Sequence, residues 1–288
     1  MKISSIFKKV GSPPHLGRDR ALTLAEQISA ATHLVSSLEL LVRKEDRTEG
    51  GLNDWNIARD NYTPRIPGMK KFLDCIGNRR NTQILHGART CAAASLLIPG
   101  THRIHRAAAN GFLAATSMAT YPRHSYGTDG SDQVSYIVQI AALTARIGQH
   151  NHRIVDAALW YVALQSTMSY AVSGYVKMVS PVWRSGAALP GILRTETYGD
   201  QQLYKLISNH PELSKALAHT VLLMECGFPA VFLAKGKLAP AILAAAGSFH
   251  VVNARAMGLG RFLTAFVATY PAVLYAAQQR RLPAGAAR

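Results

Sequence analysis

The stretch from residue 170 to residue 186, YAVSGYVKMVSPVWRSG, places Lys177 near the end of a long apolar segment. In a partly apolar surround the charged form of a lysine is disfavoured, so Lys177 can act as a base near neutral pH or hold an anion. In the alternative interpretation the side chain lies along a membrane helix and extends its ammonium group to the lipid headgroups. Pro181, Trp183 and Gly186 follow directly and favour a functional site at this position over an isolated lysine at a helix end.

Asp129 and Asp132 form a D-x-x-D pair in the stretch TDGSDQ. Two carboxylates this close can hold Mg²⁺ for a diphosphate. One of them can also stay protonated as a general acid, because its neighbour carries a negative charge. Equally, Asp129 can cap the start of a helix by accepting hydrogen bonds from backbone N–H groups. Both interpretations remain open.

His250 and Asn253 are three residues apart in FHVVNARAMGLG, so they share one face of a helix. A histidine inside a membrane helix usually has a functional partner, although a hydrogen bond between helices is the alternative. Glu225, the most deeply placed carboxylate, either pairs with Arg89 or His219 or accepts a proton from the site.

The catalytic candidates are therefore Lys177, Asp129, Asp132 and His250. The residues expected to bind substrate are Trp183, Asn253, Glu225, Tyr126 and Tyr175. The neighbouring histidines of 102–105 and 150–152 have no third ligand nearby and do not predict a metal site. The sequence has no glycine-rich phosphate loop and no G-x-S-x-G motif.

The chain of 288 residues is 48% hydrophobic and 17% charged, with a formal net charge of +16. The basic residues do not gather on one helix or tail with interleaved aromatics, so we do not expect a nucleic-acid partner. They fall in short clusters between apolar segments, which is typical of cytoplasmic loops. Composition and charge together predict a multi-pass protein of the cell membrane, in contact with the lipid bilayer.

The apolar segments predict an all-α bundle of about eight transmembrane helices, each long enough to cross the hydrocarbon layer. In that arrangement both termini are cytoplasmic, and the longer loops face outward with Lys177, Asp129 and His250 on the same side. Because the first segment contains Glu26 and His33, it could instead be an amphipathic surface helix. The expected spans are 21–42, 84–100, 103–121, 133–149, 153–178, 214–234, 238–257 and 262–279.

Three regions follow from this pattern. Residues 1–20 form a basic cytoplasmic N-terminus, 21–280 the helical membrane domain, and 281–288 a cytoplasmic tail. Within the membrane domain, 43–82 is expected to be an ordered outer loop. The 186–212 region is expected to hold a re-entrant or interfacial helix that breaks near Pro211.

The motif GYVKMVSPVWRSG, followed later by FHVVNARAMGLGRF, resembles the paired signatures of the vitamin-K-dependent γ-carboxylase membrane domain. It is also similar to the related horizontally transferred transmembrane (HTTM) domain proteins, which include the B component of the sporulation-delaying-protein maturation system. The resemblance implies an all-helical membrane domain with its reaction centre toward the extracytoplasmic side. It further implies that Lys177 is the base that deprotonates a quinol.

The sequence departs from the carboxylase in two respects. Asp-Gly-Ser-Asp stands where the carboxylase has an Asn-His-Ser motif. The lumenal half that binds substrate propeptides in the carboxylase has no counterpart here. We therefore do not expect carboxylation of protein glutamate.

Together these features predict a membrane enzyme with an acid–base cleft for a lipophilic substrate or cofactor, such as a quinol or an isoprenoid. One form of this chemistry is a lyase or terpene cyclase reaction, in which a protonated Asp129 donates its proton to an alkene and Trp183 stabilises the resulting carbocation. Mg²⁺ is a possible cofactor through Asp129 and Asp132. The alternative is a non-catalytic factor that matures or secretes a small peptide together with a partner protein.

Overall fold

The computed structural model describes residues 15–61, 67–124 and 129–279. Within these ranges the chain folds into helices and short turns and contains no strand, so the predicted all-α fold is confirmed. Of the basic terminus expected at 1–20, residues 1–14 lie outside the described ranges. The tail expected at 281–288 lies outside them entirely.

Thirteen α-helices follow one another along the described chain. They are α1 (Arg18–Val42), α2 (Trp55–Ala58), α3 (Met69–Gly77), α4 (Arg79–Leu97), α5 (Arg103–Thr120), α6 (Gly130–Ile147), α7 (His152–Val179), α8 (Pro181–Ser185), α9 (Ala188–Leu193), α10 (Gln201–Ser208), α11 (Pro211–Gly227), α12 (Ala239–Met257) and α13 (Gly260–Gln279). Single 3₁₀ turns lie at η2 (Glu45–Arg47), η3 (Arg59–Asn61) and η4 (Tyr121–Arg123), and η5 (Phe228–Gly236) continues α11.

Seven of the eight expected apolar segments coincide with a long helix to within about five residues, whereas the expected 214–234 segment runs past the end of α11 into η5. Only one described helical segment, Pro211–Gly236, is both long and apolar enough to cross a membrane, with a mean hydropathy of 1.6. The expectation of eight spans is therefore not confirmed. The other long helices have lower hydropathy because serine, threonine, histidine, glutamine and arginine interrupt their apolar residues.

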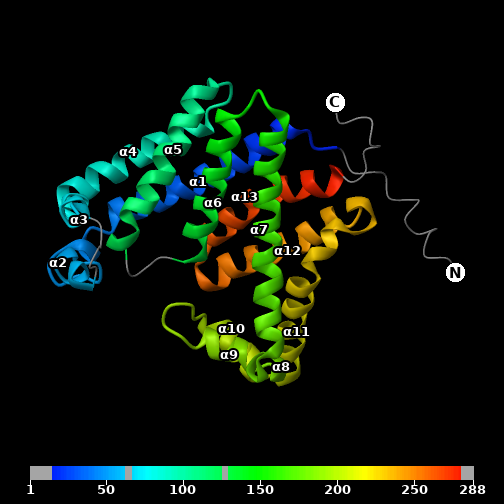
Figure 1. The fold of residues 1–288 in the computed structure, drawn as a ribbon. Coiled ribbons are helices and arrows are strands. Elements are labelled where there is room, and N and C mark those ends of the chain that lie inside the picture. Colours follow the sequence, from blue (N-terminus) through cyan, green and yellow to red (C-terminus); the bar gives the residue numbers. More distant parts are fainter. Residues whose placement is uncertain (1–14, 62–66, 125–128, 280–288) are drawn as a thin grey trace.

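The two long loops of the sequence contain short helices. The 43–82 segment holds η2, α2, η3 and α3, and α4 already begins at Arg79. In the 186–212 region, α10 ends at Ser208 and α11 begins at Pro211, so the predicted break near Pro211 is present. Proline is well tolerated at the first position of a helix, where its missing N–H has no helical partner. Figure 1 shows α8, α9 and α10 gathered around one end of α7.

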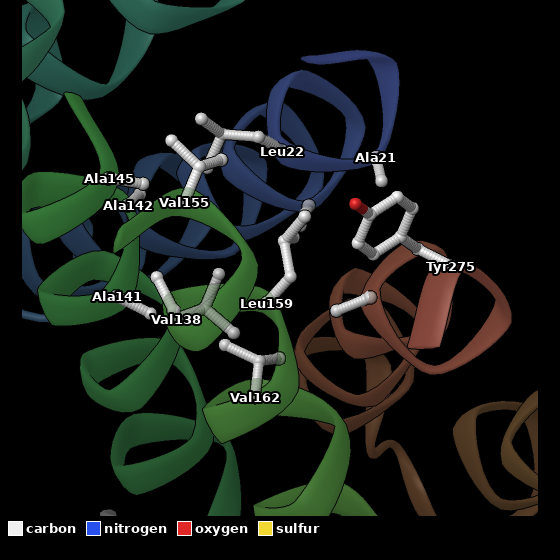
Figure 2. Close-up of a cluster of buried hydrophobic side chains, with 13 residues drawn as sticks. Ala21, Leu22, Val138, Ala141, Ala142, Ala145, Val155, Leu159, Val162 and Tyr275 are labelled. Carbon is white, nitrogen blue, oxygen red and sulfur yellow. The ribbon is translucent and has the colours of Figure 1, made fainter. Parts of the chain in front are cut away.

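One part of the core lies where α1, α6, α7 and α13 meet (Figure 2). Val138, Leu159 and Val162 fill this region, and Tyr275 closes it from α13. Alanines at 21, 141, 142 and 145 are nearly or fully buried. Their small side chains allow the helix backbones to approach closely, as is common where helices associate in a bilayer.

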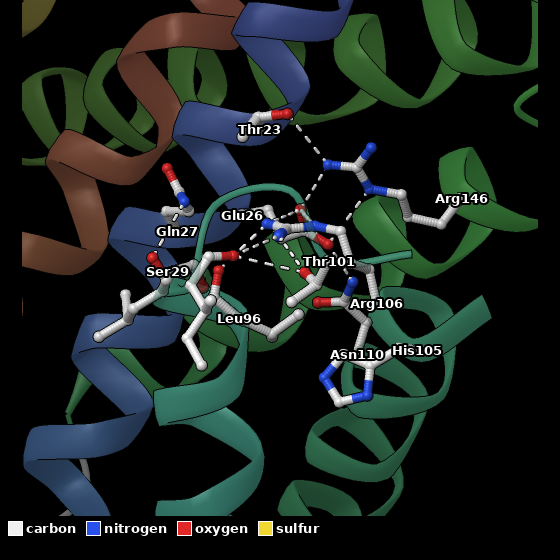
Figure 3. A network of polar contacts seen from close by, with 12 residues as sticks. Thr23, Glu26, Gln27, Ser29, Leu96, Thr101, His105, Arg106, Asn110 and Arg146 are labelled. Atoms are coloured by element: carbon white, nitrogen blue, oxygen red, sulfur yellow. Dashed lines mark hydrogen bonds and ion pairs between the residues drawn. The ribbon is translucent and has the colours of Figure 1, made fainter. Parts of the chain in front are cut away.

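A buried ion cluster joins α1 to α5 and α6 (Figure 3). Glu26 is fully buried, and its Oε2 lies 2.6 Å from nitrogens of both Arg106 and Arg146. Asn110 donates a further hydrogen bond to the same carboxylate. The carboxylate of Glu26 therefore points into the protein and holds three helices together, and His33 on the same helix is also buried.

Candidate functional site

Lys177 forms an ion pair with Glu225 where α7 crosses α11. Its Nζ lies 2.6 Å from both carboxylate oxygens of Glu225 and donates a third hydrogen bond to Ser173, also over 2.6 Å. The Trp183 ring lies beside the same ammonium group, with its centroid 5.2 Å from Nζ. Because the Glu225 side chain is only 4% exposed, its charge depends on the lysine for compensation.

The close approach of the two helices depends on Gly174. A Cβ atom at this position would lie 2.7 Å from the backbone nitrogen of Cys226 and 2.9 Å from Cβ of Glu225. Glycine one turn before Lys177 thus lets α7 touch α11 beside the ion pair. Of the two alternatives for Glu225, the pairing with Arg89 or His219 is wrong. Arg89 instead contacts α5 and His33, and His219 contacts the carbonyl of Arg184.

His250 is the end of a short chain of polar side chains. Its Nε2 lies 2.6 Å from the Tyr170 hydroxyl, which lies 2.9 Å from the hydroxyl of Tyr270. The imidazole is 1% exposed and stacks on Phe266, with ring centroids 4.7 Å apart. Its Nδ1 has no hydrogen-bond partner among the described residues. The ring is therefore held firmly by one nitrogen, while the other nitrogen is unused.

These groups line one cavity of about 240 Å³. Polar side chains come from α7 (Ser169, Ser173, Lys177), α11 (Glu225) and α12 (His250, Asn253), and aromatic walls come from Tyr170, Trp183, Phe249, Phe262 and Phe266. The structure thus brings together five residues that the sequence proposed for the site: Lys177, Glu225, His250, Asn253 and Trp183. It gathers them from three long helices and the short α8.

A second hollow of about 350 Å³ adjoins this cavity. The two share Leu189, Val221, Phe249, Asn253 and Met257 as lining residues. The rest of the second hollow is mostly apolar, with Leu193, Leu203 and Ile207 contributed by α9 and α10. The combined space suits a ligand with one polar group and an elongated apolar body.

The turn after α8 positions the helices that cover both hollows. Gly186 has a φ of 86°, which a side chain would strain, and its carbonyl accepts a 2.6 Å hydrogen bond from Ser214 Oγ. A Cβ here would also lie 2.6 Å from Cα of Lys215. The turn directs α9 back along α11, which brings Leu189 to the boundary between the hollows.

Asp129 and Asp132 form the capping box of α6 and do not line the cavity. Asp129 Oδ1 accepts from the backbone N–H of Ser131 over 2.7 Å, and Asp132 accepts from the N–H of Asp129. Burial raises the pKa of Asp132, and the nearby Arg261 cation opposes this shift. No cluster of three or more metal-ligating side chains occurs among the described residues. The hydrogen bonds of Asp129 and Asp132 therefore agree with the interpretation in which Asp129 caps a helix.

The remaining candidates are two tyrosines. Tyr175 is 61% exposed and is not among the lining residues, because it lies on the opposite side of α7 from Ser173 and Lys177. Tyr126 lies outside the described residues. Tyr170 and Ser173 were missed, although they are spaced at 170, 173 and 177 with Lys177 and so occupy one helix face. This helical spacing in the sequence could have identified Tyr170 and Ser173 as site residues.

Comparison of the chain with known protein families, with characterised proteins and with solved structures gives no match. The interpretation of the cavity therefore depends on its geometry and on the motifs of the sequence.

Proposed function

We propose that this chain is a membrane-embedded acid–base enzyme that removes a proton from a lipophilic substrate, of the quinol or isoprenoid class. The observation that carries the proposal is the ion pair of Lys177 and Glu225 in the wall of a cavity that continues into an apolar hollow. A buried ion pair contributes little to stability compared with apolar packing, so its presence beside a cavity favours a functional role.

The pair can supply a base without creating net charge in the cavity. Transfer of a proton from Lys177 to Glu225 along their 2.6 Å contact would leave a neutral amine and a neutral carboxylic acid. The amine could then accept the proton of a substrate hydroxyl, and the resulting ammonium would remain beside the substrate anion. This use of Lys177 is the one that the γ-carboxylase-like motif implies.

The other polar groups would orient the substrate. Asn253 lines both hollows and can therefore bind the substrate where its polar group meets its apolar body. Tyr170, fixed between His250 and Tyr270, sets the position of the imidazole. The Trp183 ring, with its centroid 5.2 Å from the Lys177 Nζ, would face the ammonium that forms when the amine accepts the substrate proton. Asp129 and Asp132 have no part in this mechanism, since both cap α6.

The membrane setting is part of the same proposal. Large apolar side chains on α7, α11 and α12 are more than half exposed, including Val172, Val176, Val179, Leu223, Val251 and Val252. These helices surround the cavity, so a bilayer that covered them would bring lipophilic substrates directly to it. In this arrangement the chain crosses the membrane several times, both termini are cytoplasmic, and the site opens toward the outer side.

Mass spectrometry of the small molecules retained by the detergent-purified protein tests the proposal. We expect wild type to retain a quinone-like or polyprenyl species, and Lys177→Met and Glu225→Gln to lose or alter it. Lys205→Met is the matched control, because Lys205 is exposed on α10 and lines neither hollow. If all four proteins carry only ordinary phospholipids, the cavity does not bind such a substrate and the proposal fails.

A further inference from the structure

A separate polar cavity of about 340 Å³ lies among the short helices that connect α1 to α4. Figure 1 shows α2 and α3 at the left edge of the molecule, away from α8, α9 and α10 at the end of α7. The cavity is lined by η2 and α2, by the end of α3 and the start of α4, and by Arg123 of η4. None of its lining residues belongs to the cavity that contains Lys177.

Two buried arginines in its wall have unused donors. Arg47 is 5% exposed and Arg123 is 2% exposed. Each donates to a backbone carbonyl, Arg47 to Leu40 and Arg123 to Asn53. The Nη1 of Arg47 and the Nε of Arg123 have no hydrogen-bond partner, and neither side chain forms an ion pair with a carboxylate of the described residues.

The carboxylates around the cavity are engaged elsewhere or lie at the surface. Asp54 accepts from the backbone N–H groups of Gly50 and Asn56, over 2.9 and 3.0 Å. Asp74 accepts from the indole of Trp55 and forms an ion pair with Arg59. Glu49, the remaining acidic lining residue, is exposed.

Burying two guanidinium groups that form no ion pair with the described residues is costly, and each group increases the cost of the other. Burial lowers the pKa of both arginines and outweighs the carboxylates of Asp54 and Asp46, which favour the charged forms of Arg123 and Arg47. Burial, together with the nearby Arg47 cation, lowers the pKa of Arg123 to about 10, so the arginine still carries its charge at neutral pH. A metal cation would be repelled from this position. An oxyanion in the cavity would compensate the remaining positive charge of both guanidinium groups.

We propose that the cavity beside α2 and α3 binds a phosphate-type oxyanion, held by Arg47 and Arg123. Phosphate offers several acceptor oxygens, so one group can receive hydrogen bonds from both guanidinium groups. Arg79, exposed at the edge of the same cavity, adds a cation near the entrance. The source of the oxyanion is either free phosphate or the headgroup of an anionic phospholipid. This site is independent of Lys177 and of the function proposed for it.

Titration of the detergent-purified full chain with inorganic phosphate tests this site. Calorimetry and the melting temperature would be followed at pH 7, with sodium chloride used to keep the ionic strength constant. We expect saturable binding and a rise in the melting temperature for wild type. Arg123→Gln and Arg47→Gln should each weaken binding by about tenfold or more, because each loses a hydrogen bond between charged groups. Arg80→Gln, on the exposed start of α4 outside the lining, should bind as wild type does.

The melting temperature without phosphate separates this role from a purely structural one. If Arg123 serves the oxyanion, Arg123→Gln removes a buried charge that has no ion pair among the described residues and melts no lower than wild type in phosphate-free buffer. The proposal would be overturned by a large loss of stability in that buffer. It would also be overturned by a wild-type response to phosphate no greater than that to chloride, or by unchanged binding in both variants.

A comparison of dioctanoyl phosphatidic acid with dioctanoyl phosphatidylcholine identifies the source of the oxyanion. Tighter binding than inorganic phosphate indicates a lipid headgroup, and equal or weaker binding indicates free phosphate.

Discussion

Glu26 is the residue whose charge the fold depends on most directly. Its carboxylate is fully buried and is the only acidic partner of Arg106 and Arg146 among the described ion pairs. Breaking a buried pair is far more costly than never forming it, because the remaining charge is left without compensation. Two cations depend on this single carboxylate.

We predict that Glu26→Gln lowers the free energy of unfolding by about 3–5 kcal/mol, the range typical of a broken buried ion pair. Glu39→Gln is the matched control on the same helix. Glu39 pairs with Arg261, but its side chain is 47% exposed, so its loss should cost less than about 1 kcal/mol. Denaturant titration of both variants measures the difference. Equal effects of the two substitutions would show that Glu26 contributes no more than a surface charge.

His124 makes stability depend on pH. Burial lowers the pKa of His124 to about 3, and the cations of Arg47, Arg123 and Arg89 act in the same direction. The unfolded chain, where a histidine has a pKa of about 6.5, therefore binds a proton that the folded chain does not. The stabilisation is present above pH 6.5 and is lost as the pH falls toward 3.

We predict that the free energy of unfolding falls by roughly 1.4 kcal/mol per pH unit below pH 6.5 through His124 alone. In His124→Phe this part of the slope should disappear between pH 6.5 and 4.5. His152→Phe, at an exposed position, should keep the wild-type slope. Denaturant titrations across this pH range provide the measurement. Parallel slopes for wild type and His124→Phe would mean that His124 titrates alike in the folded and unfolded chains.

At the scale of helices, the contact between α7 and α11 decides whether the Lys177 site exists. Gly174 allows the contact, because any side chain there meets the backbone of α11. Glycine in the middle of a helix otherwise costs up to about 1 kcal/mol relative to alanine. Glycine nevertheless occurs one turn before Lys177, because the backbones of α7 and α11 must approach closely there.

We predict opposite effects for two glycine substitutions in long helices. Gly174→Ala should destabilise the fold by about 1–3 kcal/mol, as is typical of an overpacked contact. Gly87→Ala in α4 has open space at its Cβ and should stabilise by up to about 1 kcal/mol. Melting temperatures of the two variants test this. A stabilised Gly174→Ala would show that α11 moves away easily and that the helices are not locked together.

The positions of the long helices could be predicted from the sequence because apolar residues recur over stretches long enough to define each helix. Lys177, Glu225, His250 and Asn253 could also be selected, since polar residues inside apolar segments stand out. The pairing of Lys177 with Glu225 could not be predicted, because it depends on the crossing at Gly174, which is a property of tertiary packing.

The proposed oxyanion site could not be predicted from the sequence for a related reason. Arg47 and Arg123 resemble surface charges until the short helices around α2 bury them.

For the molecule as a whole, exposed apolar surface is concentrated on helices that carry few charges. Leu223 is 77% exposed on α11, which belongs to the one described segment that is long and apolar enough to span a bilayer. Val176 on α7 and Val252 on α12 are each 59% exposed. Surface of this kind on three helices is typical of contact with lipid or with another protein. The buried charges around Glu26 fit a bundle whose polar groups face inward.

We predict that these positions contact lipid hydrocarbon in reconstituted vesicles. Spin labels at Leu223→Cys and Val176→Cys, with Cys75, Cys91 and Cys226 replaced by serine, should be reached by dissolved oxygen far better than by a water-soluble nickel reagent. Labels at Arg80→Cys and Lys205→Cys, on exposed polar positions, should show the reverse order. Oxygen partitions into hydrocarbon, whereas the polar nickel reagent is excluded from it. If the labels at 223 and 176 respond as those at 80 and 205 do, the exposed apolar face lies in water or against a protein partner, and substrate entry from the bilayer is wrong.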